Sequence, residues 1–330
     1  MREGNFPPAS LFCAVQYGEV ASVRPEGRYL VNISVLGIVY SLSAALVWGT
    51  VPVVYRFCMV RGSPFKLQAF RGVGFLVFAV VIALVLPEIV PAPVVTIVVA
   101  SLGGLSANLV GDTLFMYGIR HIGASASAAV AGTYPLFASL LSVVLLREPL
   151  TVGIMAGIGC VLGGLFLFQS RERGTFAEIR PGDVRIGLLL SLLTALFWGM
   201  SFVASRWAIT RGNITAPGIV FWQAISFFAA SWLSWGVLWE RSERREPFVR
   251  WPLRETIAML SVGALSLGLA GGLSSAALKH APASVVTPIS ATGPIITAFW
   301  GRLLLGERLG ARQWVGIGLI LVGGALLTLG

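Results

Sequence analysis

One acidic residue lies well inside a stretch of the sequence that is otherwise apolar. Asp112 falls in the apolar block 93–117 and Asn108 precedes it by four residues, so on a helix both side chains project from one face. Holding an aspartate at the centre of a membrane costs about 2.5 to 3.5 kcal/mol, so an aspartate found there is expected to face a polar cavity. Its chemistry would be to carry a proton or to bind a cationic amine. The alternative is that Asp112 sits near its helix end, bonded to Arg120 or to lipid headgroups.

Aromatic and amide side chains are further candidates for lining such a cavity. Trp48 and Trp198 fall near the middle of two apolar blocks, and Thr194, Ser201 and Ser205 share the helical face of Trp198. A stripe that mixes polar and aromatic side chains can line an amphipathic pocket. The remaining candidates combine a polar group with an apolar setting: Tyr55, Tyr134, Trp222, Gln223 and Thr292. For each of these, packing or anchoring at the membrane surface is the alternative.

Two prolines and three arginines in these blocks suggest structural roles. Pro135 and Pro294 each remove a backbone hydrogen bond and can kink a helix, so we interpret them as conformational hinges, with a purely structural kink as the alternative. Arg56, Arg71 and Arg206 lie near the ends of blocks. Because long arginine side chains can reach the membrane surface, we interpret these three as boundary anchors, with anion binding as the alternative.

The elements that must position these residues are ten membrane-spanning helices. Apolar residues make up 56% of the 330, and charged residues only 12%, against about a quarter in soluble domains. Each block is long enough for a helix that crosses a membrane, and none alternates as the strands of an outer-membrane barrel do. The predicted spans are 33–57, 66–86, 93–117, 124–146, 152–169, 184–208, 216–239, 255–278, 283–305 and 312–329.

The sequence contains an internal repeat. Ser41, Trp48-Gly49 and Arg56 recur 150 residues later as Ser191, Trp198-Gly199 and Arg206. Farther along, residues recur at an offset of 159, among them His121, Pro135, Glu148 and Gly164, which match His280, Pro294, Glu307 and Gly323. Each half has five spans, an odd number, so the second half must enter the membrane from the opposite side. This predicts an inverted repeat around a central cavity, an arrangement common in alternating-access transporters.

The repeated motifs carry a family resemblance. They are the Trp-Gly of the first span in each half, Ala-Leu-Lys-His-Ala-Pro-Ala-Ser at 277–284, Leu-Leu-Gly-Glu-Arg-Leu at 304–309, and the closing Gly-Ile-Gly helices. The chain resembles the EamA branch of the drug/metabolite transporter superfamily over nearly all of residues 33–330. The resemblance implies a ten-helix bundle that moves amino acids, nucleobases or other small metabolites, often outward. The first half departs from the pattern at Arg147, where the second half has Gly306.

The domain organisation follows from the repeat. Residues 33–169 and 184–330 form the two halves, and 170–183 link them. Residues 1–32 are polar and proline-containing, so we expect them to be disordered or to precede a true translation start near Val31. Seven of the 24 Lys and Arg residues fall on the side of the termini, which leaves 17 for the other. The positive-inside rule therefore predicts that both termini lie outside the cell, whereas the resemblance favours termini inside.

The expected function is secondary transport of small metabolites such as amino acids across the cytoplasmic membrane, with a coupling proton and in the outward direction. Candidate partners are the substrate, lipid and, in a homodimer, a second copy. We expect no nucleic-acid partner, because the net charge of +10 is spread over short loops.

No cofactor, metal or catalytic residue is expected, because Cys13, Cys58 and Cys160 lack metal-ligand spacing and no protease or nucleotide-binding motif occurs. The alternatives are a channel or uncoupled facilitator and an intramembrane enzyme, which would need two facing aspartates or a buried Ser-His pair.

Overall fold

The structure is a computed structural model. It describes residues 34–58, 64–86, 92–122, 127, 130–169, 181–242, 253–293, 295–296, 299–300, 303 and 310–329. Of these, the side chains of 51–58, 168–169, 181–183, 238–242, 313 and 328–329 are not described. The predicted segment 1–32, Pro294, and the side chains of Tyr55 and Arg56 therefore lie outside the described parts.

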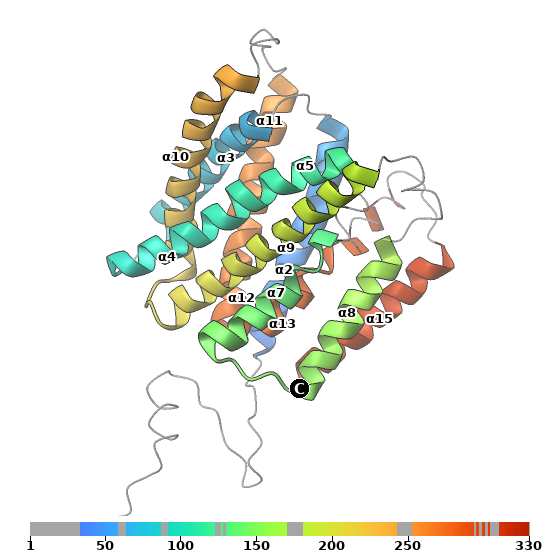
Figure 1. Ribbon diagram of the computed structural model, residues 1–330. Coiled ribbons are helices and arrows are strands. Elements are labelled where there is room, and N and C mark those ends of the chain that lie inside the picture. The colour runs from blue at the N-terminus through green and yellow to red at the C-terminus, as the bar shows by residue number, and fades with distance from the viewer. Residues whose placement is uncertain are drawn as a thin grey trace, which may run out of the picture.

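The described chain is helical, and no strand occurs in it (Figure 1). Three stretches are wound as π-helix: η1 and η3 continue the α-helices on either side of them, and η2 ends the helix that α7 begins. In chain order the elements are α2 (Val35–Cys58), α3 (Pro64–Val85), α4 (Val94–Leu105), η1 (Ser106–Gly111), α5 (Asp112–Ile122), α7 (Tyr134–Leu141), η2 (Ser142–Leu146), α8 (Val152–Gln169), α9 (Pro181–Thr210), α10 (Ala216–Ser242), α11 (Leu253–Val262), η3 (Gly263–Ala270), α12 (Gly271–His280), α13 (Ala283–Ser290) and α15 (Ala311–Leu329).

Helices occupy the predicted spans, although some boundaries differ. α4, η1 and α5 form one continuous helix for the third span, and α11, η3 and α12 do so for the eighth. The helix α9 begins at Pro181, earlier than the predicted 184, because proline suits the first turn of a helix, where no backbone donor is needed. Among the described residues, five helices are long and apolar enough to cross a membrane, and four shorter apolar helices accompany them.

The fourth span is interrupted instead of kinked. Residues 132 and 133 form a turn, and α7 starts at Tyr134 with Pro135 in its first turn. The ninth span has a turn at 291 and 292, which are the repeat-related positions. Pro135 thus lies in the first turn of a new helical segment, where a backbone N–H would have no partner within the helix. Its role as a hinge stays a prediction.

The π-helical stretches η1 and η3 also occur at repeat-related positions in the third and eighth spans. Residues 106–111 plus the offset of 159 give 265–270, which lie within Gly263–Ala270. A π-turn widens the helix and shifts its hydrogen bonds, so it leaves backbone carbonyls available to side chains, and such turns are frequent at functional sites. The side chains of Gln68 and Trp48 bond to carbonyls in these two stretches.

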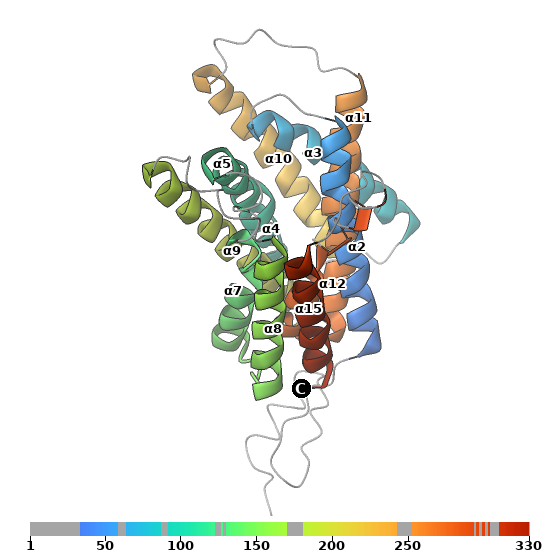
Figure 2. The ribbon, with the colours of Figure 1, turned by 90° about the vertical axis from the view of Figure 1, so that its right-hand side faces the viewer.

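The last helices of the two halves, α8 and α15, meet along a glycine-lined seam (Figure 2). A Cβ added to Gly164 would lie 2.6 Å from the carbonyl oxygen of Gly316, and one added to Gly323 would lie 2.8 Å from that of Gly157. Residue numbers rise along one helix as they fall along the other, so α8 and α15 are antiparallel. Without side chains at these positions the two backbones pack closely, as small residues allow in lipid.

The first helix of each half packs against the fourth helix of the other half. Gly199 of α9 lies against the backbone of α7, where an added Cβ would sit 2.8 Å from the nitrogen of Ala138. Its repeat mate, Gly49 of α2, lies against the backbone of Gly293.

The outer faces of the bundle are apolar, with Leu84 and Val152 about four-fifths exposed, as expected of a surface that meets lipid.

The two ends of the bundle differ in how closely the helices approach. In Figure 2 the starts of α9 and α11 lie on opposite sides of the upper part of the view. Near their other ends α9 and α12 are in contact, where Arg206 bonds to the carbonyl of Leu278. At that end α2 begins and α15 ends, and the backbone N–H of Ser34 bonds to the carbonyl of His280 over 3.3 Å. We call this end, defined by Ser34, His280 and Leu329, the termini end.

The glycine seam predicts a difference between two adjacent substitutions. Gly164→Ala places a methyl group against the Gly316 carbonyl, so it should destabilise the protein by about 1 to 3 kcal/mol through overpacking. Gly163→Ala is the matched control, because no described atom lies within 4 Å of its added Cβ and alanine favours a helix over glycine by about 1 kcal/mol. Thermal unfolding of the purified protein in detergent measures both. Equal midpoints for the two variants would contradict this packing.

Candidate functional site

Asp112 lies at the junction of η1 and α5, where two side chains from other helices meet it. Its Oδ2 accepts a hydrogen bond and ion pair of 2.8 Å from Nη1 of Arg71 on α3. Its Oδ1 accepts a bond of 3.0 Å from the indole Nε1 of Trp198 on α9. Arg120 instead stacks over the ring of Tyr117, with 5.4 Å from its Cζ to the centroid. The alternative in which Asp112 bonds to Arg120 is therefore wrong.

A buried glutamine extends this contact to the backbone of η1. Gln68 lies one helical turn before Arg71 and accepts from its Nη1 over 2.7 Å. Its amide Nε2 donates to the backbone carbonyl of Asn108 over 2.7 Å, one of the positions at which the π-turn alters the hydrogen bonding. The polar chain thus runs from the Asn108 carbonyl through Gln68 and Arg71 to Asp112 and Trp198. We call these five residues the Asp112 cluster.

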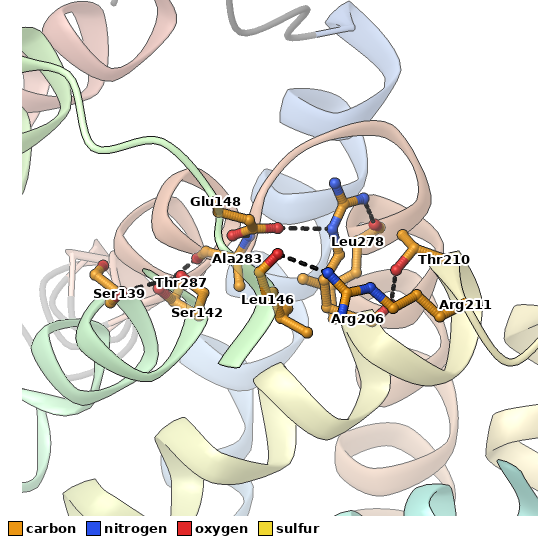
Figure 3. A network of polar contacts seen from close by, with 10 residues as sticks. All are labelled: Ser139, Ser142, Leu146, Glu148, Arg206, Thr210, Arg211, Leu278, Ala283 and Thr287. Atoms are coloured by element: carbon orange, nitrogen blue, oxygen red, sulfur yellow. Dashed lines mark hydrogen bonds and ion pairs between the residues drawn. The ribbon is translucent and has the colours of Figure 1, made fainter. Parts of the chain in front are cut away.

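The interpretation of Arg71 and Arg206 as boundary anchors is wrong. Both residues are only 4% exposed. Arg71 pairs with Asp112, and Arg206 pairs with Glu148 through its Nε over 2.8 Å (Figure 3). A charged group in a dry interior is stabilised only when an opposite charge and further hydrogen bonds accompany it, which both arginines have.

An aromatic cluster adjoins Asp112 on the other side of the Trp198 indole. The Trp198 ring lies edge-on to Tyr134, with 5.9 Å between centroids, and 5.4 Å from Phe115. Tyr134 stacks on Phe202 at 5.4 Å, and Phe202 meets Trp48 edge-on at 6.2 Å. The structure therefore brings together three predicted site residues, Trp48, Tyr134 and Trp198, around Phe202.

The two repeat-related tryptophans use their indole groups differently. Trp48 donates to the backbone carbonyl of Ser266 in η3 over 2.9 Å. Trp198 donates to the carboxylate of Asp112. The repeat mate of Asp112 is Gly271, which offers no side-chain acceptor, and no described atom lies within 4 Å of a Cβ built there. The carboxylate thus replaces a backbone acceptor in one half only.

The remaining predicted site residues occupy other positions. Gln223 is 9% exposed and donates to the carbonyl of Ala100 over 3.2 Å and to Ser205 over 3.4 Å, so it ties α10 to α4 and α9. Trp222 packs edge-on against Phe221, beside a separate apolar cluster around Ile219. The hydroxyl of Thr292 donates to the carbonyl of Ile289 in its own segment. Asn108 contributes its backbone carbonyl to the cluster.

Sequence reasoning missed Gln68, Arg71 and Phe202 as site residues. The available signal was that Gln68 and Arg71 are both polar, lie inside the predicted span 66–86 and are three residues apart. On a helix this spacing places them on one face. No comparable signal marks Phe202, because phenylalanines are frequent throughout the spans. Among the described residues, no group of three or more His, Cys, Asp or Glu lies close enough to hold a metal ion.

Comparison with known proteins matches both halves of the chain to one family. The model of the EamA-like transporter family matches residues 35–169 and again 185–329. A Bacillus anthracis protein named "putative sugar uptake protein" is 23% identical over 303 residues, which cover 88% of this chain and 98% of that protein. A protein of Archaeoglobus fulgidus named "uncharacterized transporter" is 24% identical over 298 residues, covering 89% and 98%. A solved crystal structure shares the fold with a TM-score of 0.73 at 20% identity, covering 89% of this chain and 96% of the other.

The buried pair predicts non-additive effects on stability. Asp112→Asn and Arg71→Gln should each destabilise the protein by about 3 to 5 kcal/mol, because each leaves a buried charge without its partner. The double variant should lose clearly less than the sum, since neither charge remains. Thermal unfolding in detergent gives the coupling. As a control, Asp112→Asn combined with Lys279→Gln, an exposed lysine of α12, should be additive, and additivity for both combinations would exclude a direct pair.

Proposed function

Because this chain belongs to the EamA-like transporter family, we propose that it is an alternating-access secondary transporter of small polar metabolites that acts through the Asp112 cluster. It is a membrane transporter with a small-molecule substrate. The transport mode, the site and the location in the cytoplasmic membrane are what we propose beyond this. The single observation that carries the site is the largely buried carboxylate of Asp112, held between an arginine of the first half and a tryptophan of the second.

The arrangement of the halves supports the transport mode. The antiparallel contact of α8 with α15 and the exchange of first and fourth helices are the relations expected of an inverted repeat. A carrier of this kind can rock one set of helices against another around a site near the middle of the membrane. The Asp112 cluster draws on α3, η1, α5 and α9, so such a movement would change its contacts.

The charge balance of the cluster suggests how a proton and a substrate could be coupled. With Asp112 ionised, Arg71 is neutralised and the cluster carries no net charge. Protonation of Asp112 would remove its attraction for Arg71 and leave the guanidinium available to an acceptor on the substrate. A substrate amine would instead compete with Arg71 for Asp112. In both cases Trp198 and the aromatic cluster would provide an amphipathic wall, on which apolar faces of a small metabolite can pack.

The main alternative is a channel or facilitator without coupling. Channels that select ions use rings of polar groups related by symmetry. The carboxylate of Asp112 is present in one half, whereas Gly271 stands at the equivalent position of the other. This asymmetry favours a carrier with one specialised site. The direction of transport is part of the test, because the family resemblance implies export, whereas the name of the Bacillus anthracis relative refers to uptake.

Counterflow in proteoliposomes tests the proposal. We expect saturable exchange of at least one labelled compound from a panel of amino acids, nucleobases and sugars, with a rate that depends on an imposed pH gradient. Asp112→Asn should lower the exchange at least about tenfold, the equivalent of about 1.4 kcal/mol, and abolish its pH dependence. Flux that does not saturate, in a protein that is folded, would favour the channel.

Glu255→Gln is the matched control for this experiment. It removes an acidic side chain from the first turn of α11, outside the Asp112 cluster, and should leave both rate and pH dependence unchanged. If Asp112→Asn behaved like this control, the assignment of the site to Asp112 would be wrong even though the protein is a carrier. Net flux measured with the gradient in each direction then establishes whether export or uptake is favoured.

A further inference from the structure

A second buried ion pair joins the two halves at the termini end. Glu148, in the segment that follows η2, accepts through Oε1 from the Nε of Arg206 over 2.8 Å. Its Oε2 accepts from the backbone N–H of Ala283 over 3.1 Å. Arg206 also donates through Nη1 to the carbonyl of Leu278 (Figure 3). The glutamate belongs to the first half, and its two partners belong to α9 and α13 of the second half, where Arg206 also contacts α12.

The pair fits the two helix ends that it touches. Ala283 is the first residue of α13, and Pro282 before it provides no side-chain cap, so the carboxylate of Glu148 satisfies a free N–H at the positive end of that helix. Leu278 lies in the last turn of α12, where the guanidinium of Arg206 meets a free carbonyl at the negative end. The pair therefore binds the C-terminal end of α12 and the N-terminal end of α13, on the two sides of the short connection between these helices.

A neighbouring arginine of the second half likewise binds a carbonyl at a helix end, in this case in the first half. Arg211, just after α9, donates through Nη2 to the carbonyl of Leu146 over 2.7 Å. Leu146 is the last residue of η2, which ends where Arg147 adopts a left-handed conformation with φ of 58°. The helical end that carries Glu148 is thus itself tied to α9. These contacts join η2 to α9, α12 and α13.

The surroundings of the pair are closed. The side chains of Arg206 and Glu148 are 5% and 9% exposed, and every residue from 281 to 290 is buried. Water therefore has little access to these two side chains. When an ion pair of this kind is dry, separating the charges is costly, but the cost falls when water enters and hydrates both groups. Such a pair stabilises the conformation in which this end of the bundle is closed. It contributes little to the free energy once the end is open and both charges are hydrated.

We propose that Glu148 and Arg206 form a lock that keeps the termini end closed, and that this lock breaks when the end opens to water. The inference rests on the proposed function, because it assigns the pair to one step of alternating access. It differs from a static brace, which would stay formed in every conformation. Loss of a brace would loosen the whole protein, whereas loss of the lock would shift the population toward the state that is open at the termini end.

Cysteine labelling in detergent distinguishes the two. Thr287→Cys, in a background without Cys13, Cys58 and Cys160, places a thiol in fully buried α13 close to the lock. We expect N-ethylmaleimide to label it slowly when the lock is intact, and at least about tenfold faster in Glu148→Gln or Arg206→Gln. A second reporter, Ser231→Cys on α10, is equally buried but lies at the contact with Gly72 of α3 and should label at an unchanged rate. Faster labelling at both reporters, or at neither, would overturn the lock.

Two further variants separate the lock from simple charge effects. Lys279→Gln removes an exposed positive charge of α12 at the same end and should leave the labelling of Thr287→Cys unchanged. The exchange Glu148→Arg with Arg206→Glu keeps an ion pair but turns each charge toward the wrong helix end, so labelling should stay fast. Slow labelling in the exchanged protein would overturn the role given to the helix ends.

The experiment also separates this inference from the proposed function. Labelling needs no substrate, so failure of the protein to exchange any compound would count against the transporter without changing the test of the lock. If the wild type exchanges a substrate saturably and Glu148→Gln changes neither the exchange nor the labelling, the lock is refuted while the transporter stands.

Discussion

The interior of a membrane offers no water to charged or backbone polar groups, and this constraint explains where the polar residues of this chain are found. Each buried charge described above is paired: Arg71 with Asp112, and Arg206 with Glu148. Backbone carbonyls left available by the π-helical stretches are also used, that of Asn108 by Gln68 and that of Ser266 by Trp48. Polar groups thus link neighbouring helices, and each of these hydrogen bonds or ion pairs can persist only while both of its groups stay in contact.

Two kinds of contact in the bundle differ in how they can change. The seam of α8 and α15 consists of glycine backbones in close approach, and a packed contact of this kind has no charge to hydrate and no partner to exchange. We propose that the ion pairs, in contrast, exchange a protein partner for water, a proton or a substrate. On this proposal the glycine seam stays constant, and the contacts that change are those of the Asp112 cluster, which joins α3, η1, α5 and α9, and of the Glu148–Arg206 pair at the termini end.

Hydropathy was sufficient to predict where the helices lie, because a span must be long and apolar whatever it packs against. Repetition predicted which positions are equivalent, and the breaks at 132–133 and 291–292 fall at such positions. The cost of a buried aspartate singled out Asp112, but its partner was missed because a residue's distance from the end of a block does not reveal which way its side chain turns. Arg71 and Arg206 were both misinterpreted for this reason. The contacts of Phe202, and the use of Gln223 as a tie to Ala100, depend on how helices cross, which no local pattern encodes.

The deviations from symmetry carry more information about function than the symmetry itself. Two equivalent tryptophans, Trp48 and Trp198, lie in equivalent helices and face equivalent π-helical stretches. In the second half the scaffold needs only a backbone carbonyl to satisfy the indole, as Trp48 shows with Ser266. The carboxylate at position 112 is therefore unnecessary for holding the tryptophan, and it brings the expense of a second buried charge, Arg71, to neutralise it. A costly pair that the equivalent half does without is better explained by chemistry than by folding, and the chemistry of a carboxylate beside a guanidinium is to exchange one charged partner for another.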